Sequence, residues 1–350
     1  MDHSPVSVAI IGLGLGRYFI NELKDYAAAE ITALVDLDAT RLTEANALLS
    51  KPAATFGDYH EMLRTVRPEL VFVCLPNFLH KQVTIDCLEA GSAVLCEKPM
   101  AMTVAECVEM RDAAQRTDGW LGIDLSYRFH GASIACHDLV ASGALGDIYH
   151  GYTTWRRRDG IPGFGGWFGQ KKLSGGGPLI DLGVHRLDLA MWLMGDVKPV
   201  SVSGAAHHKI GVPRAEAQGK AFDVEDLAAG FIRFDGGQSL VFEISWAGLE
   251  ANKEPMETRI LGTQGGLTQH NGGQGYTTHA TYTTNVAGHL SVGDLSYDGN
   301  PKHAVQVAVD CVAEKRPFPV TAADGIRVQQ VLNALYESAS TGQEVRIAPV

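Results

Sequence analysis

The sequence predicts a protein of two parts: a doubly wound parallel α/β sheet, then an open, mostly antiparallel sheet flanked by helices. In the first third, short apolar runs alternate with amphipathic stretches, as in β-α-β units. After about residue 124, single strands alternate apolar and polar residues, which is typical of sheets with one buried face. A chain of 350 residues has room for two domains, and we expect them at 1–123 and 124–350. The C-terminal helices are free to pack back on the first domain.

The first domain is expected to contain four buried strands. Their nearly unbroken apolar character indicates helices on both faces of the sheet. Thr103 and Glu106 have the spacing of a capping box, which predicts a helix beginning there. Gly91 is expected to end the helix before it. The predicted strands cover residues 6–11, 31–35, 70–75 and 93–96.

The second domain is expected to be built on strands with unlike faces. Leu240, Phe242, Ile244 and Trp246 alternate with mostly polar neighbours, which predicts a half-buried strand. Residues 148–158, 228–234 and 256–261 are further strand candidates, and the glycine-rich, polar stretch 262–275 is expected to be a connection. Apolar stripes at helical spacing predict two helices near the C-terminal end, around residues 304–312 and 328–335.

A glycine turn directly after the first strand predicts a dinucleotide site. Glycine lets backbone amides approach a pyrophosphate, whose charge a helix N-terminus stabilises. In the G-x-G-x-x-G pattern the third glycine would fall at Arg17, so either the helix packs differently or Gly16 takes that role. The residues expected to touch the cofactor here are Gly12, Leu13, Gly14, Leu15, Gly16 and Arg17.

Asp36 directly follows the second predicted strand and is expected to select between the two nicotinamide cofactors. Its carboxylate is placed to accept hydrogen bonds from ribose hydroxyls, and its charge would repel a 2'-phosphate. NAD is therefore favoured over NADP. The alternatives are that Asp36 only caps a turn, and that Arg41 accommodates a phosphate.

Asp181 and His185 form the most informative pair. They stand four residues apart behind the glycine run 175–177, so a helix would put a carboxylate and an imidazole on one face. Such a pair can remove a proton from a substrate hydroxyl. The alternative is a structural histidine paired with an aspartate.

The overall composition excludes several classes of function. A net charge of −11 repels nucleic acids and anionic membrane surfaces. There is no long apolar run or signal-like start, so we expect a cytoplasmic protein. The six cysteines lack a C-x-x-C pair and are expected to be reduced core residues. The histidines are scattered, and no metal site is expected.

Five ordered motifs make the chain resemble the Gfo/Idh/MocA oxidoreductases. Ser126 departs from the pattern, since many members have Asn there, which leaves any contact of that side chain in doubt. The motifs are the turn at Gly12, Leu75-Pro76-Asn77 with His80, Glu97-Lys98-Pro99, Tyr127-Arg128-Phe129, and Gly175-Gly176-Gly177 leading to Asp181 and His185.

The resemblance implies an NAD-dependent dehydrogenase acting on a secondary hydroxyl of a sugar, glycoside or cyclitol. In this interpretation His185 takes the hydroxyl proton, Lys98 polarises the same oxygen, and Asp181 orients the substrate. Pro99 is a candidate cis proline. The family also implies a homodimer or homotetramer formed through the open face of the second sheet. The residues expected at the nicotinamide end are Leu75, Pro76, Asn77, His80, Glu97 and Lys98.

The substrate contacts are less specific in the sequence. A polyol site needs several donors and an apolar platform, and Arg128, Arg156, Arg158 and Trp167 are candidates beside Asp181 and His185. For Trp167, packing within a loop is an equal alternative. Two other functions stay open: a glycoside-cleaving enzyme that oxidises its substrate only transiently, and a non-catalytic NAD-binding regulator. The direction of the reaction is also open.

Overall fold

The computed structural model describes residues 4–195 and 197–350, and the chain divides into two compact units. The first consists of Met1–Leu125 and Lys302–Ile326, and the second of Ser126–Pro301 and Arg327–Val350. The first break falls two residues from the expected boundary between residues 123 and 124. The segment Lys302–Ile326 belongs to the first unit although it comes late in the chain. No helix among the described residues has the length and apolarity needed to cross a membrane.

The first unit contains the predicted doubly wound sheet, which has six strands in the order β3-β2-β1-β4-β5-β6. All neighbours are parallel, so their carboxyl ends lie along one edge. Each residue of β4 is fully buried, as expected for a central strand covered on both faces. The strands are β1 (Val6–Ile11), β2 (Ala29–Val35), β3 (Ala54–Phe56), β4 (Leu70–Val73), β5 (Ala93–Cys96) and β6 (Leu121–Ile123).

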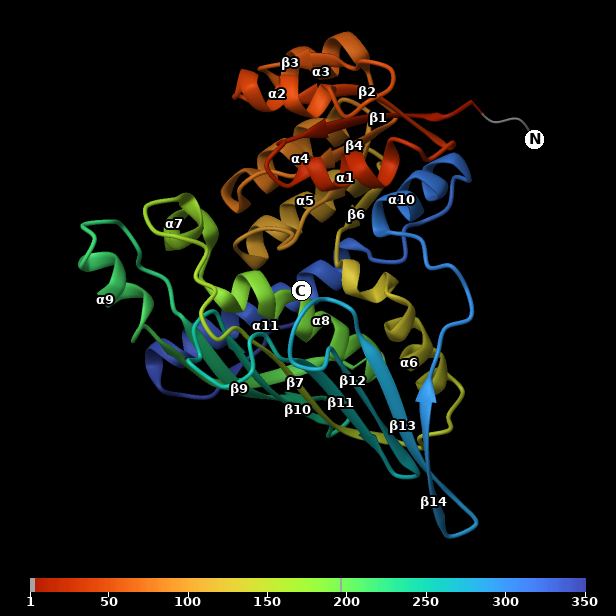
Figure 1. Cartoon of the computed structure of the whole chain (residues 1–350), viewed down its shortest axis with the longest axis vertical. Coiled ribbons are helices and arrows are strands. Elements are labelled where there is room, and N and C mark those ends of the chain that lie inside the picture. The colour runs from red at the N-terminus through yellow and green to blue at the C-terminus, as the bar shows by residue number, and fades with distance from the viewer. Residues whose placement is uncertain (1–3, 196) are drawn as a thin grey trace. The chain divides into compact units, whose positions relative to one another are not determined.

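Helices flank this sheet, and their ends follow the sequence signals (Figure 1). The capping box is present, because the Thr103 hydroxyl accepts from the Glu106 amide at 3.2 Å and the Glu106 carboxylate accepts from the Thr103 amide at 3.1 Å. Helix α10 packs against α1, β1 and β5. The helices are α1 (Gly16–Leu23), α2 (Ala39–Asn46), α3 (Tyr59–Val66), η1 (Asn77–Leu79), α4 (His80–Glu89), α5 (Val104–Arg116) and α10 (Ala304–Ala313).

The second unit is built on a nine-stranded sheet in the order β14-β13-β12-β11-β7-β10-β9-β8-β15. Its pairs are antiparallel except β7 with β10. The mostly antiparallel sheet predicted for this part is therefore confirmed. The strands are β7 (Ile148–Arg156), β8 (Pro199–His207), β9 (Leu227–Phe234), β10 (Ser239–Ser245), β11 (Met256–Gly262), β12 (Gly265–His270), β13 (His279–Val286), β14 (His289–Leu295) and β15 (Val345–Arg346).

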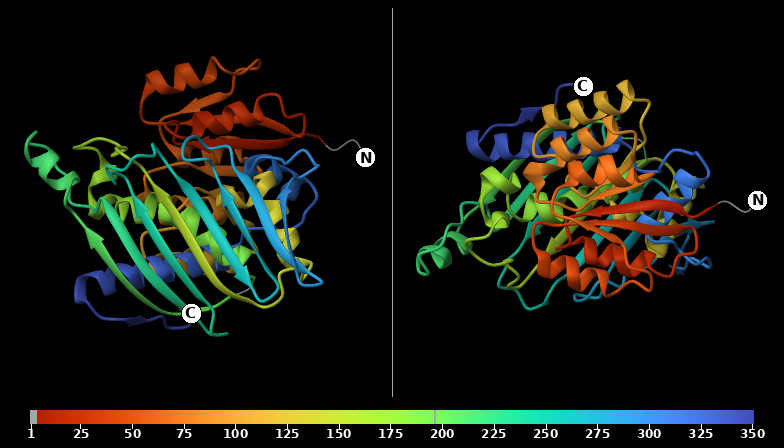
Figure 2. Two further views of the ribbon diagram at one scale, coloured as in Figure 1. Left: turned by 60° about the horizontal axis from the view of Figure 1, so that its bottom comes forward. Right: turned by 90° about the horizontal axis from the view of Figure 1, so that it is seen from above.

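Helices cover one face of this sheet and leave the other open, as the left view of Figure 2 shows. Helix α8 packs against β7 and β11, and α6 packs against β12 and β13. The helical segments are η2 (Ser126–Phe129), α6 (Gly131–Ala141), η3 (Trp167–Gly169), α7 (Lys171–Ser174), the π-helical turn η4 (Leu179–Gly183), α8 (Val184–Leu193), α9 (Gly211–Glu216) and α11 (Ala322–Thr341), whose first five residues belong to the first unit.

The expected connection over residues 262–275 was wrong. This stretch contains β12, which pairs with β11 and β13. Leu267 and Gln269 are buried, while glycine, threonine and histidine occupy the other positions. Glycine is rare in strands and masks the alternation in the sequence. Pairing with β11 and β13 outweighs that weak local preference.

Candidate functional site

The glycine turn between β1 and α1 has the geometry that a dinucleotide requires. Gly12 has φ +91°, and a side chain there would overlap the Cys74 carbonyl oxygen. A Cβ on Gly14 would meet nothing nearer than Arg41 Nη1 at 4.0 Å, so the backbone is open to a ligand. A Cβ on Gly16 would lie 2.6 Å from Ile10 Cγ2, so Gly16 allows α1 to pack on β1. Gly16 thus takes the role that the family pattern gives to position 17.

The residues around the turn differ in exposure. Leu13 is buried, and Leu15 is 42% exposed. Arg17 points away to an exposed ion pair with Glu44, at 2.9 Å. Its side chain therefore has a surface partner, and contact of Arg17 with the cofactor stays a prediction.

Asp36 follows β2 and holds the glycine turn in place. Its Oδ2 accepts from the Leu13 amide at 2.8 Å, and its Oδ1 accepts from the Asp38 amide at 2.9 Å. Each carboxylate oxygen has a second lone pair, which leaves acceptor capacity for a ribose hydroxyl. Arg41 Nη1 lies 3.8 Å from Asp36 Oδ2, so a cation stands beside the carboxylate.

His80 connects two loops at the carboxyl edge of the parallel sheet. Its Nδ1 lies 2.8 Å from the Pro99 carbonyl oxygen, and its Nε2 lies 2.7 Å from that of Leu75. The ring is fully buried, and this burial lowers the pKa of His80, although both carbonyl contacts oppose the shift. The Lys98-Pro99 peptide is cis. His80 therefore holds the Leu75–Asn77 loop against the Glu97–Pro99 loop, and any effect on a cofactor passes through them.

A buried carboxylate near Lys98 was not predicted from the sequence. Asp124 follows β6, and its amide donates to the Cys96 carbonyl at 2.8 Å. The Glu97 carboxylate accepts from the Lys98 amide at 3.0 Å. Burial raises the pKa of Asp124 well above its ordinary value, the Glu97 charge adds to this, and Lys98 opposes it. Three ionisable groups thus gather where β5 and β6 end.

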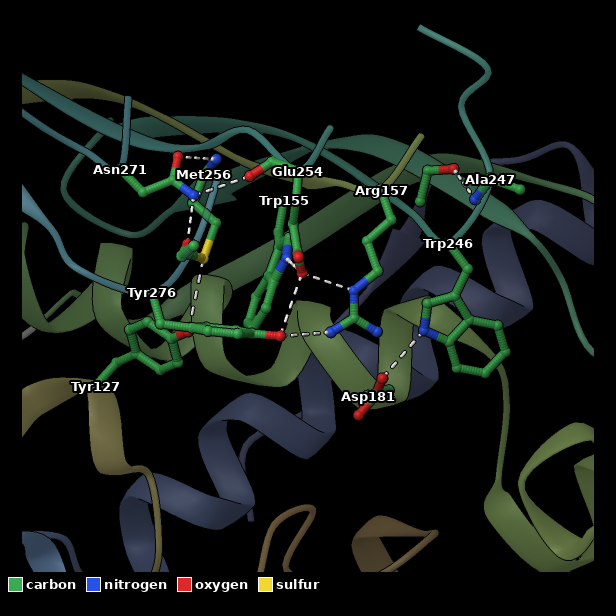
Figure 3. Close-up of polar contacts among 12 residues, drawn as sticks. Tyr127, Trp155, Arg157, Asp181, Trp246, Ala247, Glu254, Met256, Asn271 and Tyr276 are labelled. Carbon is green, nitrogen blue, oxygen red and sulfur yellow. Dashed lines mark hydrogen bonds and ion pairs between the residues drawn. The ribbon is translucent and has the colours of Figure 1, made fainter. Parts of the chain in front are cut away.

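In the second unit, Asp181 and His185 lie on consecutive helical segments. Asp181 belongs to the π-helical turn η4, and His185 belongs to the first turn of α8. The Trp246 indole donates to Asp181 Oδ2 at 3.0 Å (Figure 3). The His185 ring has its centroid 5.1 Å from that of Tyr127 and 6.2 Å from that of Trp155. Aromatic side chains thus restrict the orientation of both predicted catalytic groups.

A polar network surrounds Arg157, close to Asp181 and Trp246 in the second unit (Figure 3). Its Nε donates to Glu254 Oε1 at 2.7 Å, and its Nη2 donates to the Tyr276 hydroxyl at 3.3 Å. The Trp155 indole also donates to Glu254, at 2.9 Å. Burial alone would lower the pKa of Arg157, but the bond to Glu254 and the charges of Asp181 and Glu254 raise it. The guanidinium is therefore a fixed cation near Asp181.

Two predicted substrate contacts, Arg128 and Arg156, have other partners in the structure. Arg128 makes a bidentate ion pair with Asp188, at 2.8 and 2.5 Å. Arg156 follows Trp155 in β7, so it points to the opposite face, where it lies 3.3 Å from Glu243 and 3.1 Å from Glu250.

Arg158 and Trp167 also contact other parts of the second unit. Arg158 donates to the backbone carbonyls of Glu250 and Ala251. The Trp167 ring lies 4.6 Å from that of Phe168. Contact of the substrate with any of these four side chains stays a prediction. No group of three or more His, Cys, Asp or Glu side chains within 4–195 and 197–350 is arranged to hold a metal ion.

Comparison with known proteins identifies the family. Residues 6–124 match the oxidoreductase family with an NAD-binding Rossmann fold, and residues 134–268 match the GFO/IDH/MocA C-terminal domain. The chain belongs to the Gfo/Idh/MocA oxidoreductases. It is 34% identical to D-glucoside 3-dehydrogenase of Escherichia coli K12, over 99% of both chains. It is 28% identical to D-xylose 1-dehydrogenase [NADP(+)] of Haloarcula marismortui, over 75% of this chain and 71% of that one.

Solved structures of this family share the whole fold. Aldose-aldose oxidoreductase from Caulobacter crescentus, complexed with glycerol, has a TM-score of 0.83 at 25% identity, over 98% of this chain and 99% of that one. Levoglucosan dehydrogenase in complex with NADH also has a TM-score of 0.83, at 21% identity, over 99% and 100%. The predicted fold class and the family resemblance are both confirmed.

The residues that were not predicted from the sequence are those that hold the candidate catalytic side chains in place. Arg157 had a usable signal, because it shares strand parity with Trp155, whereas Arg156 and Arg158 have the opposite parity. Glu254, Tyr276 and Trp246 come from distant segments, and no local pattern marks them.

Proposed function

We propose that this protein is an NAD-dependent dehydrogenase that oxidises a secondary hydroxyl of a sugar, glycoside or cyclitol. The observation that carries the proposal is the pair Asp181 and His185, held on η4 and α8 by aromatic side chains. The full-length similarity to D-glucoside 3-dehydrogenase supports a glucoside as the first substrate to test, with its C3 hydroxyl as the reacting group.

In the proposed reaction the substrate loses a hydride from carbon and a proton from oxygen, and a ketone forms. His185 takes the proton as general base. Lys98 donates a hydrogen bond to the same oxygen and stabilises its developing negative charge. Asp181 accepts from a neighbouring hydroxyl and orients the sugar. NAD, when bound at the proposed cofactor site, would supply the acceptor for this hydride.

We propose the glycine turn, Asp36 and the loops after β4 and β5 as the cofactor site. At Gly14 the backbone is open to a pyrophosphate, and Gly12 and Gly16 allow the close packing that forms the turn. Asp36 has acceptor lone pairs left for the two hydroxyls of a ribose. The residues of the two loops are Leu75, Pro76, Asn77, Glu97 and Lys98, with His80 acting through the loops.

The preference for NAD over NADP is tested at Asp36. Replacing the carboxylate in Asp36→Ser should remove both the ribose acceptor and the charge that repels a 2'-phosphate. We expect kcat/KM with NAD to fall about tenfold or more, as for loss of about 1.4 kcal/mol. The ratio of kcat/KM with NADP to kcat/KM with NAD should rise. Arg41→Ala is the matched variant, and it should lower only the activity with NADP. An unchanged cofactor ratio in Asp36→Ser would contradict this assignment.

The overall function is tested with methyl glucoside and its 3-deoxy analogue, followed by inositols and free aldoses. Steady formation of NADH with methyl glucoside but not with the 3-deoxy analogue is the expected result. An enzyme that cleaves glycosides after transient oxidation would release the aglycone without accumulating NADH, which separates this alternative. Formation of NADH from the 3-deoxy analogue would place the reaction at another carbon.

A further inference from the structure

Glu225 is a buried carboxylate at the base of the segment that carries Asp181 and His185. It is 2% exposed and stands two residues before β9. Its Oε2 accepts from the Gly177 amide at 2.9 Å, and its Oε1 accepts from the Leu179 amide at 3.1 Å and from the Tyr336 hydroxyl at 2.8 Å. All these residues belong to the second unit.

The two amides that Glu225 binds stand at the start of the π-helical turn η4. Leu179 is its first residue, and the preceding Pro178 provides no side-chain cap. The first amides of a helix lack intrahelical acceptors, and a carboxylate also interacts favourably with the positive end of the helix dipole. Glu225 therefore caps this turn from a position more than forty residues away in the chain.

The glycine run is shaped by this cap. A Cβ on Gly177 would overlap the Glu225 carbonyl oxygen and lie 3.1 Å from its Cδ. A Cβ on Gly176 would overlap the Tyr336 hydroxyl and lie 2.5 Å from its Cζ. The two glycines thus let Glu225 and Tyr336 approach the backbone. This explains why glycine precedes Asp181 and His185 in the motif.

A continuous chain of contacts leads from Glu225 to Asp181. Gly177 donates its amide to Glu225, and its carbonyl accepts from the Asp181 amide at 3.1 Å. The Asp181 carboxylate is held on its other side by Trp246. Helix α8 continues directly from η4 and carries His185 in its first turn. A shift of the Gly177 backbone would therefore move Asp181 directly, and it would move His185 through the helix that joins the two residues.

We propose that Glu225 is a positioning residue, which fixes the start of η4 and thereby sets the places of Asp181 and His185. The inference rests on the proposed function for those two residues. Glu225 touches neither substrate nor cofactor in this account. Burial, and then the Glu225 charge, raise the pKa of Tyr336, so its hydroxyl stays a donor to the cap.

The test is Glu225→Gln, compared with the parent in sugar oxidation and NADH binding. Glutamine keeps the size of the side chain, but its NH2 group replaces one carboxylate oxygen. The amide of Gly177 or of Leu179 would then face a donor in place of an acceptor. We expect kcat to fall at least tenfold, while the Kd for NADH changes less than twofold. Unchanged kcat in the folded variant would overturn the proposal.

Two matched variants separate positioning from stability. Asp226→Asn changes the neighbouring buried carboxylate, which accepts from the amides of Ile210 and Gly211 at the start of α9. We expect a lower Tm but kcat within twofold of the parent. If kcat falls as far as in Glu225→Gln, the effect is general destabilisation and the proposal fails. Glu225→Asp keeps the charge and serves if Glu225→Gln does not fold; it should lose kcat partially, and full kcat would refute positioning.

A readout independent of activity keeps this inference distinct from the proposed function. The His185 imidazole can be followed by NMR titration and identified by comparison with His185→Asn. If the parent oxidises no sugar, the proposed function fails, but Glu225→Gln should still shift the His185 titration relative to the parent. Identical His185 titrations in parent and variant would overturn the positioning role by itself.

Discussion

At the scale of single residues, the groups proposed for the chemistry are held by buried neighbours. Trp246 donates to Asp181 and is fully buried. Tyr127 packs beside His185, and its hydroxyl donates a hydrogen bond to the Met256 sulfur. Burial raises the pKa of Tyr127, so its hydroxyl stays protonated. Fixed neighbours reduce the reorganisation needed when a substrate binds, which is the physical basis of preorganised sites.

Asp124 is predicted to reduce stability as the pH rises. Its folded pKa is raised, mainly by burial, and its Oδ1 has no hydrogen-bond partner among the described residues. Below about pH 4 both the folded and unfolded forms bind the proton, so the cost is absent. Above about pH 4 the Asp124 carboxyl loses its proton more readily in the unfolded chain than in the folded protein, so the free energy of unfolding falls. The difference in Tm between Asp124→Asn and the parent should therefore grow from acidic to neutral pH. A difference that shrinks over that range would contradict the assignment.

The residue types of the proposed site could be predicted from the sequence, but most of their supports could not. Lys98, Asp181 and His185 stand in short local motifs. By contrast, the Arg157 network depends on Glu254, just before β11, and on Tyr276, in the loop between β12 and β13, which the strand pairing of the second sheet brings close. The bidentate pair of Arg128 with Asp188 joins η2 to α8 in the same way. Contacts between residues so far apart in the chain leave no periodic signal.

At the scale of elements, the parallel sheet was predicted more completely than the second sheet. Strands buried on both faces are continuous apolar runs, so β1, β2, β4 and β5 were all found. The short strands β3 and β6 have three residues each and were missed. In the second sheet, β13 and β14 were missed, because most residues of β13 are polar and the apolar Leu290 and Val292 of β14 are exposed and mark no buried face. Such strands depend on pairing with their neighbours more than on local preference.

The loops that end β4 and β5 should depend on His80. In His80→Ala the carbonyls of Leu75 and Pro99 lose their buried partner and a cavity forms. We expect a loss of about 2 to 4 kcal/mol in the free energy of unfolding, measured with urea. The KM for NAD should rise, because Lys98 and Asn77 stand in the two loops. His60→Ala, at a half-exposed histidine of α3, should change stability by no more than about 0.5 kcal/mol. Equal effects of the two variants would refute the role of His80.

At the scale of the whole molecule, the cysteines of both units lie in the cores and form no disulfides within the described residues. All six are free and buried, as predicted. Burial raises the pKa of Cys107 and of Cys136, each to about 12. A thiolate is needed for reaction with a disulfide reagent, so the native protein should react slowly. We expect six thiols to be titrated in denaturant and none rapidly without it. Rapid native reaction of even one would contradict the described burial.

The most direct test of the central claim is the turnover of His185→Ala and Lys98→Ala with methyl glucoside and NAD. Loss of a general base or of the polarising amine should lower kcat by about 100 to 10,000-fold. The Kd for NADH of the His185 variant should stay close to that of the parent. Turnover within tenfold of the parent in either variant would remove that residue from the chemistry and contradict the account.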